Sequence, residues 1–130
     1  MKFQEINDET IGVLVDEFYA KARQDRELGP IFARHIGDDW EAHLNVIKLF
    51  WSNVMRADGR YRGNPMGKHL ALSEVRPHHF EIWLGLFAGT ARDLFDDPVA
   101  AVFIERANHI AQSLQIGMFQ STGPKITTLK

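Results

Sequence analysis

Histidine is the residue type in this sequence with the widest range of chemistry. The chain contains six histidines and no cysteine. They are His35, His43, His69, His78, His79 and His109. The lack of cysteine excludes disulfides, thiolate catalysis, iron–sulfur clusters and covalent c-type haem attachment. A metal ion would therefore have to be held by His, Asp, Glu or Tyr side chains.

Two of the histidines differ from the others in sequence context. His43 lies three residues after Trp40 and four before Ile47, so on a helix it shares their apolar face. His69 lies in a central segment without helical periodicity. Taken alone, these contexts favour a histidine hydrogen-bonded in a core or at a helix edge for His43, and an ordinary loop histidine for His69. The other four fall in loops or beside charged residues, where surface roles are favoured.

Two aromatic residues with one polar atom each, Tyr19 and Trp83, stand on apolar helix faces. When such a side chain is buried, its polar tip needs a partner. In one interpretation both rings pack in the core and the tips reach backbone carbonyls. In the other, both tips face a ligand, with Trp83 as a donor only and Tyr19 as a donor or an acceptor.

Motifs for several other kinds of site are missing. A di-iron bundle needs Glu-x-x-His on two helices, whereas His78 and Glu81 show that spacing once and in reversed order. His-Glu-x-x-His, a Walker loop, Gly-x-Gly-x-x-Gly and Gly-x-Ser-x-Gly do not occur. A Ser-His-Asp triad stays open, although nothing indicates a nucleophile elbow. These alternatives therefore have little support.

Four segments have the 3.6-residue periodicity of amphipathic helices. The expected helices lie at about residues 11–22, 40–54, 77–94 and 97–114. Their expected first residues or caps are Asn7 or Asp8, Asp38 or Asp39, Pro77, and Asp97 followed by Pro98. Residues 57–65 are expected to be irregular, with at most a short helix at 66–72. No strand pair is visible, so the fold class is all-α with a long central connection, which is often functional.

Size and charge limit the organisation and the partners. The chain has 130 residues and a mass of 14.9 kDa, which suits one domain. We expect residues 1–117 to form it and residues 118–130 to be a flexible tail. A net charge of −2 without a basic run argues against nucleic acid. No long apolar run and no secretory signal are visible, so we expect a cytoplasmic protein without a membrane partner.

Residues spread over 1–117 resemble the truncated haemoglobins, and His43 with Trp83 favours their third group. The matching stretches are Phe18-Tyr19, residues 28–32 ending in Phe32, His43, Phe50-Trp51, residues 68–70 around His69, and residues 80–83. The resemblance implies a two-over-two helical sandwich, with residues 28–32 as a turn and a loop-like segment around His69. The Gly-Gly pairs typical of the other truncated groups are absent here.

The same resemblance implies b-type haem (iron protoporphyrin IX) as the cofactor. His69 would be the proximal ligand of a five-coordinate iron, with Tyr19, His43 and Trp83 lining the distal side. The candidate walls of the haem pocket are Phe32, Ile47, Phe50, Leu72, Phe80 and Phe87. Lys68 and Arg76 are candidate partners of the two haem propionates.

Two classes of function follow from such a site. One is a globin that binds dioxygen, nitric oxide or carbon monoxide for storage, delivery or sensing. The other is a haem enzyme with nitric oxide dioxygenase or peroxidase-like activity, for which a reductase is a candidate partner. A haem-free interaction module is a third interpretation. We expect a monomer or weak dimer. His43 has two opposite interpretations, a second iron ligand or a gate at the mouth of the pocket, and we favour the gate.

Overall fold

The computed structural model describes residues 1–61, 63 and 73–120. In order, these form α1 (Asp8–Gln24), α2 (Leu28–Ile36), α3 (Trp40–Arg56), α5 (Pro77–Leu94) and α6 (Asp97–Gln115), which continues as a π-helical turn, Ile116–Gln120. The predicted all-α fold is confirmed. Lys68, His69, Leu72 and the short helix expected at 66–72 lie outside the described residues.

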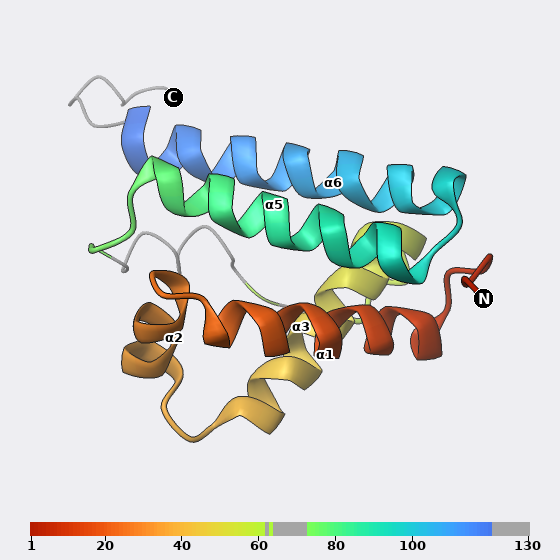
Figure 1. Ribbon diagram of the computed structural model, residues 1–130, viewed down its shortest axis with the longest axis horizontal. Helices are drawn as coiled ribbons and strands as arrows, with labels where there is room; N and C mark the ends of the chain where they lie inside the picture. The colour runs from red at the N-terminus through yellow and green to blue at the C-terminus, as the bar shows by residue number, and fades with distance from the viewer. Residues whose placement is uncertain (62, 64–72, 121–130) are drawn as a thin grey trace.

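The helices form two layers (Figure 1). α5 and α6 lie side by side and antiparallel, and α1 runs beneath them, packed against α5 and crossed by α3. α2 joins α1 to α3 at one end of the molecule. At the opposite end, Phe3 forms an isolated β-bridge. Its amide donates to the Leu94 carbonyl at 2.8 Å, and its carbonyl accepts the Asp96 amide at 3.0 Å. This bridge ties the N-terminal segment to the turn between α5 and α6.

Local sequence explains where most helices begin. At α1 the Asn7 side chain accepts the Thr10 amide at 2.9 Å, and Thr10 Oγ1 accepts the Asn7 amide at 3.0 Å, which makes a capping box. Pro77 begins α5 as predicted, in the first turn where its missing N–H costs no helical bond. Asp39 precedes α3, but without a side-chain cap bond. At α6 the prediction was one residue late, because Asp96 is the cap and Asp97 is already helical.

The resemblance implied a turn at residues 28–32, and this was wrong, since a nine-residue helix, α2, occupies 28–36. Pro30 falls in the first turn of α2, where a proline is tolerated. The Asp25 carboxylate accepts the amides of Glu27 and Leu28, each at 2.9 Å, and so replaces a conventional cap. Gly29 is needed at this corner because a Cβ there would collide with the Arg23 carbonyl oxygen.

The helices enclose a core rich in phenylalanine. Its largest fully buried side chains are Phe18, Phe87, Phe95 and Phe103. A second cluster joins α2, α5 and α6 through Ile31, Val75, Phe80, Ala111 and Leu114, and Met118 and Phe119 pack against it. The chain thus stays helical past Gly117, and residues 121–130 of the expected tail lie outside the described part. No described helix is both long and apolar enough to span a membrane.

The α1–α2 corner gives a first testable prediction. Gly29→Ala forces its new methyl group against backbone and should lower the free energy of unfolding by roughly 1–3 kcal/mol. Urea denaturation followed by circular dichroism measures this loss.

Gly85→Ala is the matched control, because Gly85 lies within α5 with open space around the added Cβ. Removing glycine from a helix interior should raise the stability by about 0.5–1 kcal/mol. A Gly29→Ala protein as stable as wild type would show that the corner does not need glycine.

Candidate functional site

A buried tyrosine hydroxyl lies at the centre of the candidate site. Tyr19 projects from α1 into the core and is 7% exposed. The indole of Trp83 on α5 is hydrogen-bonded to its hydroxyl. Because an indole N–H only donates, the tyrosine oxygen is the acceptor of this bond. Burial raises the pKa of Tyr19 to about 12, so the group stays a neutral hydroxyl at physiological pH.

Three further rings surround Tyr19 on the side of α2 and α3. The ring centres of Phe32, Trp40 and His43 lie 5.7, 6.0 and 6.0 Å from that of Tyr19. His43 is half-buried and meets both Tyr19 and Trp40 edge to face. Tyr19, Trp83 and His43, which come from three helices, are therefore brought together.

Trp83 is held in place by a stack of three rings. Phe87 lies nearly parallel to Trp83, with centroids 5.5 Å apart, and to Trp51 of α3, with centroids 4.9 Å apart. Phe18 of α1 meets the edges of the stack, 5.6 Å from Trp83 and 5.5 Å from Phe87. Phe87 stacks with both tryptophans and is 1% exposed, so it packs behind Trp83.

Several side chains of the apolar stripe of α3 are only partly buried, although the amphipathic pattern predicts that this face is covered. The fully buried side chains of α3 are Trp40, Trp51 and Ser52. Leu44, Ile47, Phe50 and Val54 pack against the core but stay partly exposed, as does Phe32 of α2. A partly uncovered apolar flank beside a pair of buried polar tips suits a large flat apolar cofactor whose bound ligand needs hydrogen-bond donors. The residues present therefore fit haem.

Of the remaining residues predicted to bind the cofactor, the structure describes two, Phe80 and Arg76. Phe80 is 7% exposed in the second cluster and meets Phe119 at 6.1 Å. The Arg76 guanidinium donates to the Ser73 and Val75 carbonyls at 2.7 and 3.2 Å. Lys68, His69 and Leu72 fall outside the described ranges, so the proximal assignment stays a prediction.

Sequence reasoning missed one member of the ring cluster. Trp40 served only as a reference point for His43, whereas in the structure it packs against Phe32, Tyr19 and His43. The Arg23 guanidinium lies 4.2 Å above its ring in a cation–π contact. Tyr19 and Arg23 lie one helical turn apart on α1, and this spacing was the available signal that one aromatic ring could contact both.

The other histidines lie elsewhere. His35 contacts Glu74 at 2.8 Å, and together with Arg34 it lowers the pKa of the Glu74 carboxyl to about 2. His78 and His79 approach Glu27, at 2.6 and 3.6 Å. These three residues could group around a metal ion. However, His79 Nδ1 accepts the Arg76 amide at 2.8 Å, so in the neutral ring Nε2 carries the proton and is a donor rather than a ligand.

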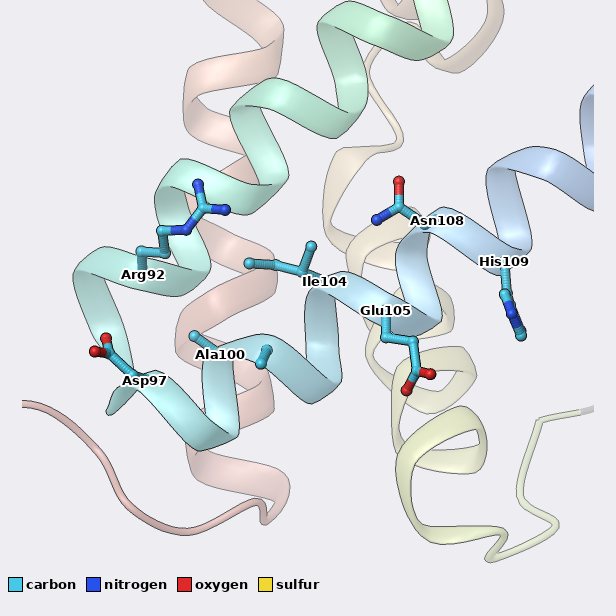
Figure 2. Close-up of a pocket in the computed structure, with 8 residues that line it drawn as sticks. Arg92, Asp97, Ala100, Ile104, Glu105, Asn108 and His109 are labelled. Atoms are coloured by element: carbon cyan, nitrogen blue, oxygen red, sulfur yellow. The ribbon is translucent and has the colours of Figure 1, made fainter.

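An open hollow on α5 and α6 is not the candidate site. It has a volume of about 670 Å³, and the side chains that line it extend from α5 and α6 (Figure 2). Its lining carries opposed charges from Arg92, Asp97 and Glu105 beside His109. None of the residues of the Tyr19 cluster lines it, and its mixed charge offers no single recognition chemistry.

Two packed helix pairs, with the side chains of Tyr19, Trp83 and His43 brought together beside α3, are the arrangement of a globin of the two-over-two kind. No protein-family model matches the sequence. A curated relative, Group 3 truncated hemoglobin ctb of Campylobacter jejuni, is 37% identical over 126 residues, which cover 95% of this chain and 99% of the relative. The crystal structure of group III truncated hemoglobin from Campylobacter jejuni superposes with a TM-score of 0.89 and covers the same shares of the two chains. The protein belongs to the group III truncated haemoglobins and is a haem globin, which implies small diatomic ligands.

Proposed function

We propose that the protein binds dioxygen, and also nitric oxide and carbon monoxide, at a five-coordinate b-type haem with His69 as the proximal ligand. Tyr19, Trp83 and His43 form the distal side. The observation that supports this most directly is the buried Tyr19 hydroxyl, which accepts a hydrogen bond from Trp83 beside the His43 ring. A buried hydroxyl of this kind can donate a hydrogen bond to a polar ligand within otherwise apolar surroundings.

Haem, when bound, supplies the iron that holds the diatomic ligand and shifts negative charge onto it in the case of dioxygen. The Tyr19 oxygen already accepts from Trp83, which leaves its own O–H free to donate to a ligand. A donor to a charged acceptor contributes about 1.5–3 kcal/mol. The pair therefore stabilises dioxygen selectively over carbon monoxide, which carries less charge.

The apolar residues hold the porphyrin, and the basic ones hold its propionates. The proposed walls are Phe32, Ile47, Phe50, Leu72 and Phe80, with Phe87 packed behind Trp83. Lys68 and Arg76 are the proposed propionate partners. Arg76 would exchange its bonds to the Ser73 and Val75 carbonyls for a carboxylate, which a charged acceptor favours.

The same donors suit a haem enzyme with nitric oxide dioxygenase or peroxidase-like activity. The rate of dioxygen release separates the two functions, because delivery needs fast release while slow release favours chemistry on the held ligand. A measured release rate is therefore the experiment that decides between them.

The proximal assignment predicts that His69→Ala purifies with little haem, or lacks the spectrum of a five-coordinate His-ligated ferrous form. His109→Ala is the control, because His109 is exposed on α6, away from the Tyr19 cluster, and its loss should leave haem content unchanged. Absorption spectra of the oxidised and reduced proteins measure both. A native spectrum in His69→Ala would redirect the assignment to another histidine.

The distal pair predicts that Tyr19→Phe and Trp83→Phe each speed dioxygen release by roughly ten- to a hundredfold, since the first removes the O–H that donates to the ligand and the second removes the N–H that donates to Tyr19. Carbon monoxide release should change little. In wild type the release rate should not vary with the titration of Tyr19 between about pH 6 and 9, since its raised pKa keeps the proton on the hydroxyl throughout that window.

Stopped-flow ligand replacement measures these rates. If the carbon monoxide and dioxygen rates rise together, the cause is lost packing in the Trp83–Phe87–Trp51 stack and the hydrogen-bond account is wrong.

The gate interpretation of His43 predicts faster ligand association in His43→Ala than in wild type. It also predicts a wild-type rate that rises as the pH falls from about 8 to 5, because a charged imidazole prefers water to an apolar pocket. Flash photolysis across that range tests both. A low-spin six-coordinate ferrous spectrum that disappears in His43→Ala would show instead that His43 binds the iron.

A further inference from the structure

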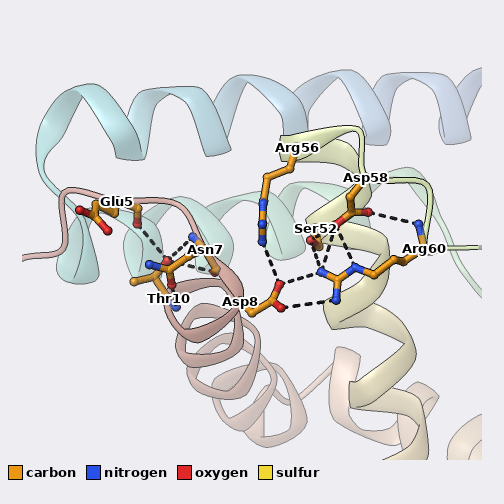
Figure 3. A network of polar contacts seen from close by, with 8 residues as sticks. All are labelled: Glu5, Asn7, Asp8, Thr10, Ser52, Arg56, Asp58 and Arg60. Carbon is orange, nitrogen blue, oxygen red and sulfur yellow. Dashed lines mark hydrogen bonds and ion pairs between the residues drawn. The ribbon is translucent and has the colours of Figure 1, made fainter.

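A polar network at the far end of α3 joins the start of α1, the last turns of α3 and the residues that follow α3. Figure 3 shows Arg60 between Asp8 at the start of α1, Ser52 on α3, and Asp58. Its guanidinium Nη2 donates to Asp8 Oδ1 and to Ser52 Oγ, both at 2.7 Å, and Nε donates to Asp58 Oδ2 at 3.0 Å. We call these four residues the Arg60 clamp.

The clamp is anchored in the protein interior at Ser52. This side chain is 1% exposed, and its hydroxyl donates to Asp58 while accepting from Arg60. The Ser52 hydroxyl, and then Arg60, hold the pKa of the Asp58 carboxyl at about 2. A second arginine, Arg56, donates to Asp8 Oδ1 at 2.9 Å. The network is therefore tied to the core and is not a single exposed ion pair.

The backbone inside the clamp needs such support. Ala57, which ends α3, has φ of 52°, and Gly59 has φ of 74°. A left-handed alanine is unfavourable by itself, so other contacts must hold it. The Gly59 amide donates to Asn53 Oδ1 at 2.8 Å, and the Arg60 amide donates to Asp58 Oδ1 at 3.2 Å. These bonds fix the direction in which the chain leaves α3.

That direction brings the next residue onto the proposed haem wall. The ring of Tyr61 meets the ring of Phe50 edge to face, with centroids 5.1 Å apart. Phe50 in turn meets Trp51 of the ring stack at 5.8 Å. A chain that left α3 along another path would take Tyr61 away from Phe50.

We propose that Arg60 is a positioning residue for haem retention, because its bonds to Asp8, Ser52 and Asp58 set the path that seats Tyr61 against Phe50. The proposal rests on the assignment of Phe50 to the haem wall in the proposed function. Arg60 acts through Tyr61 and Phe50, without contact to the cofactor.

Lys21 is a matched control for Arg60. Both side chains are 43% exposed, and both bind α1 to another element, since Lys21 donates to Thr90 at 3.2 Å and approaches Asp93 at 3.6 Å. Lys21 contacts no residue of the proposed haem wall in these bonds. If Arg60 had only a general stabilising role, the rate of haem loss would follow the loss of unfolding free energy in the same way in Lys21→Gln and Arg60→Gln.

The experiment measures haem transfer from the holoprotein to an excess of a high-affinity apoglobin, with Soret circular dichroism as a second readout of ring packing around the cofactor. Arg60→Gln should lose haem roughly three- to tenfold faster than wild type and change the Soret dichroism, while Lys21→Gln should do neither. Urea unfolding measures the loss of unfolding free energy in each variant, and haem loss in Arg60→Gln should exceed what that loss accounts for. Equal haem-loss rates in Arg60→Gln and wild type would overturn the proposal.

A double substitution tests whether Arg60 acts through Tyr61. In a Tyr61→Ala background, Arg60→Gln should add less than about twofold to the rate of haem loss, since coupled residues are not additive. If Arg60→Gln still raises the rate of haem loss three- to tenfold in the Tyr61→Ala background, Arg60 does not act through Tyr61. His69→Ala separates the two proposals, because its failure to reduce haem content would contradict the proximal assignment and leave the Arg60 comparison standing.

Discussion

The stack of Trp51, Phe87 and Trp83 is the contact on which the rest of the site depends. Three nearly parallel rings connect α3 to α5, and Phe18 of α1 closes their edges. Close-packed aromatic cores resist displacement, since any shift costs dispersion contacts on several sides. Trp83 is the outer member of the stack, so its indole N–H is directed by the core and not by a loop. A hydrogen-bond donor held in this way needs little reorganisation when a ligand arrives.

The polar atoms of the described core all have partners before any ligand binds. Thr10 and Thr90 bond to the carbonyls of Glu5 and Leu86, Ser52 bonds to Asp58, and no described buried side-chain polar atom is left without a bond. Tyr19 and Trp83 follow the same rule by bonding to each other. The donor pair of Tyr19 and Trp83 is therefore satisfied internally, which avoids the cost of an unpaired buried polar group. It still presents one further O–H, so a ligand adds a bond without first breaking the existing one.

The sequence predicts those features that depend on neighbouring residues. The Asn7 cap, Pro77 and the apolar stripes follow from local chemistry, and the stripes placed Tyr19, His43 and Trp83 on buried faces. Their meeting depends on how three helices pack, which periodicity does not contain, so only the family resemblance predicted it. α2 was missed because Gly29 and Pro30 in a short segment favour a turn, whereas the Asp25 cap makes them compatible with a helix. Two further features could not be predicted from the sequence either, because each joins residues of different elements. They are the contact of Arg23 with Trp40 and the Arg60 clamp.

α3 carries residues of both proposals, His43 near its start and Ser52 near its end. His43 lies in its first turn, where its half-buried ring meets Tyr19 and Trp40 edge to face. Ser52, bonded to Arg60, lies in its last turns. Between them Trp51 is fixed in the ring stack at 3% exposure. In the two proposals, ligand access depends on His43 in the first turn of α3, and haem retention depends on Arg60, which is bonded to Ser52 near the other end of the same helix.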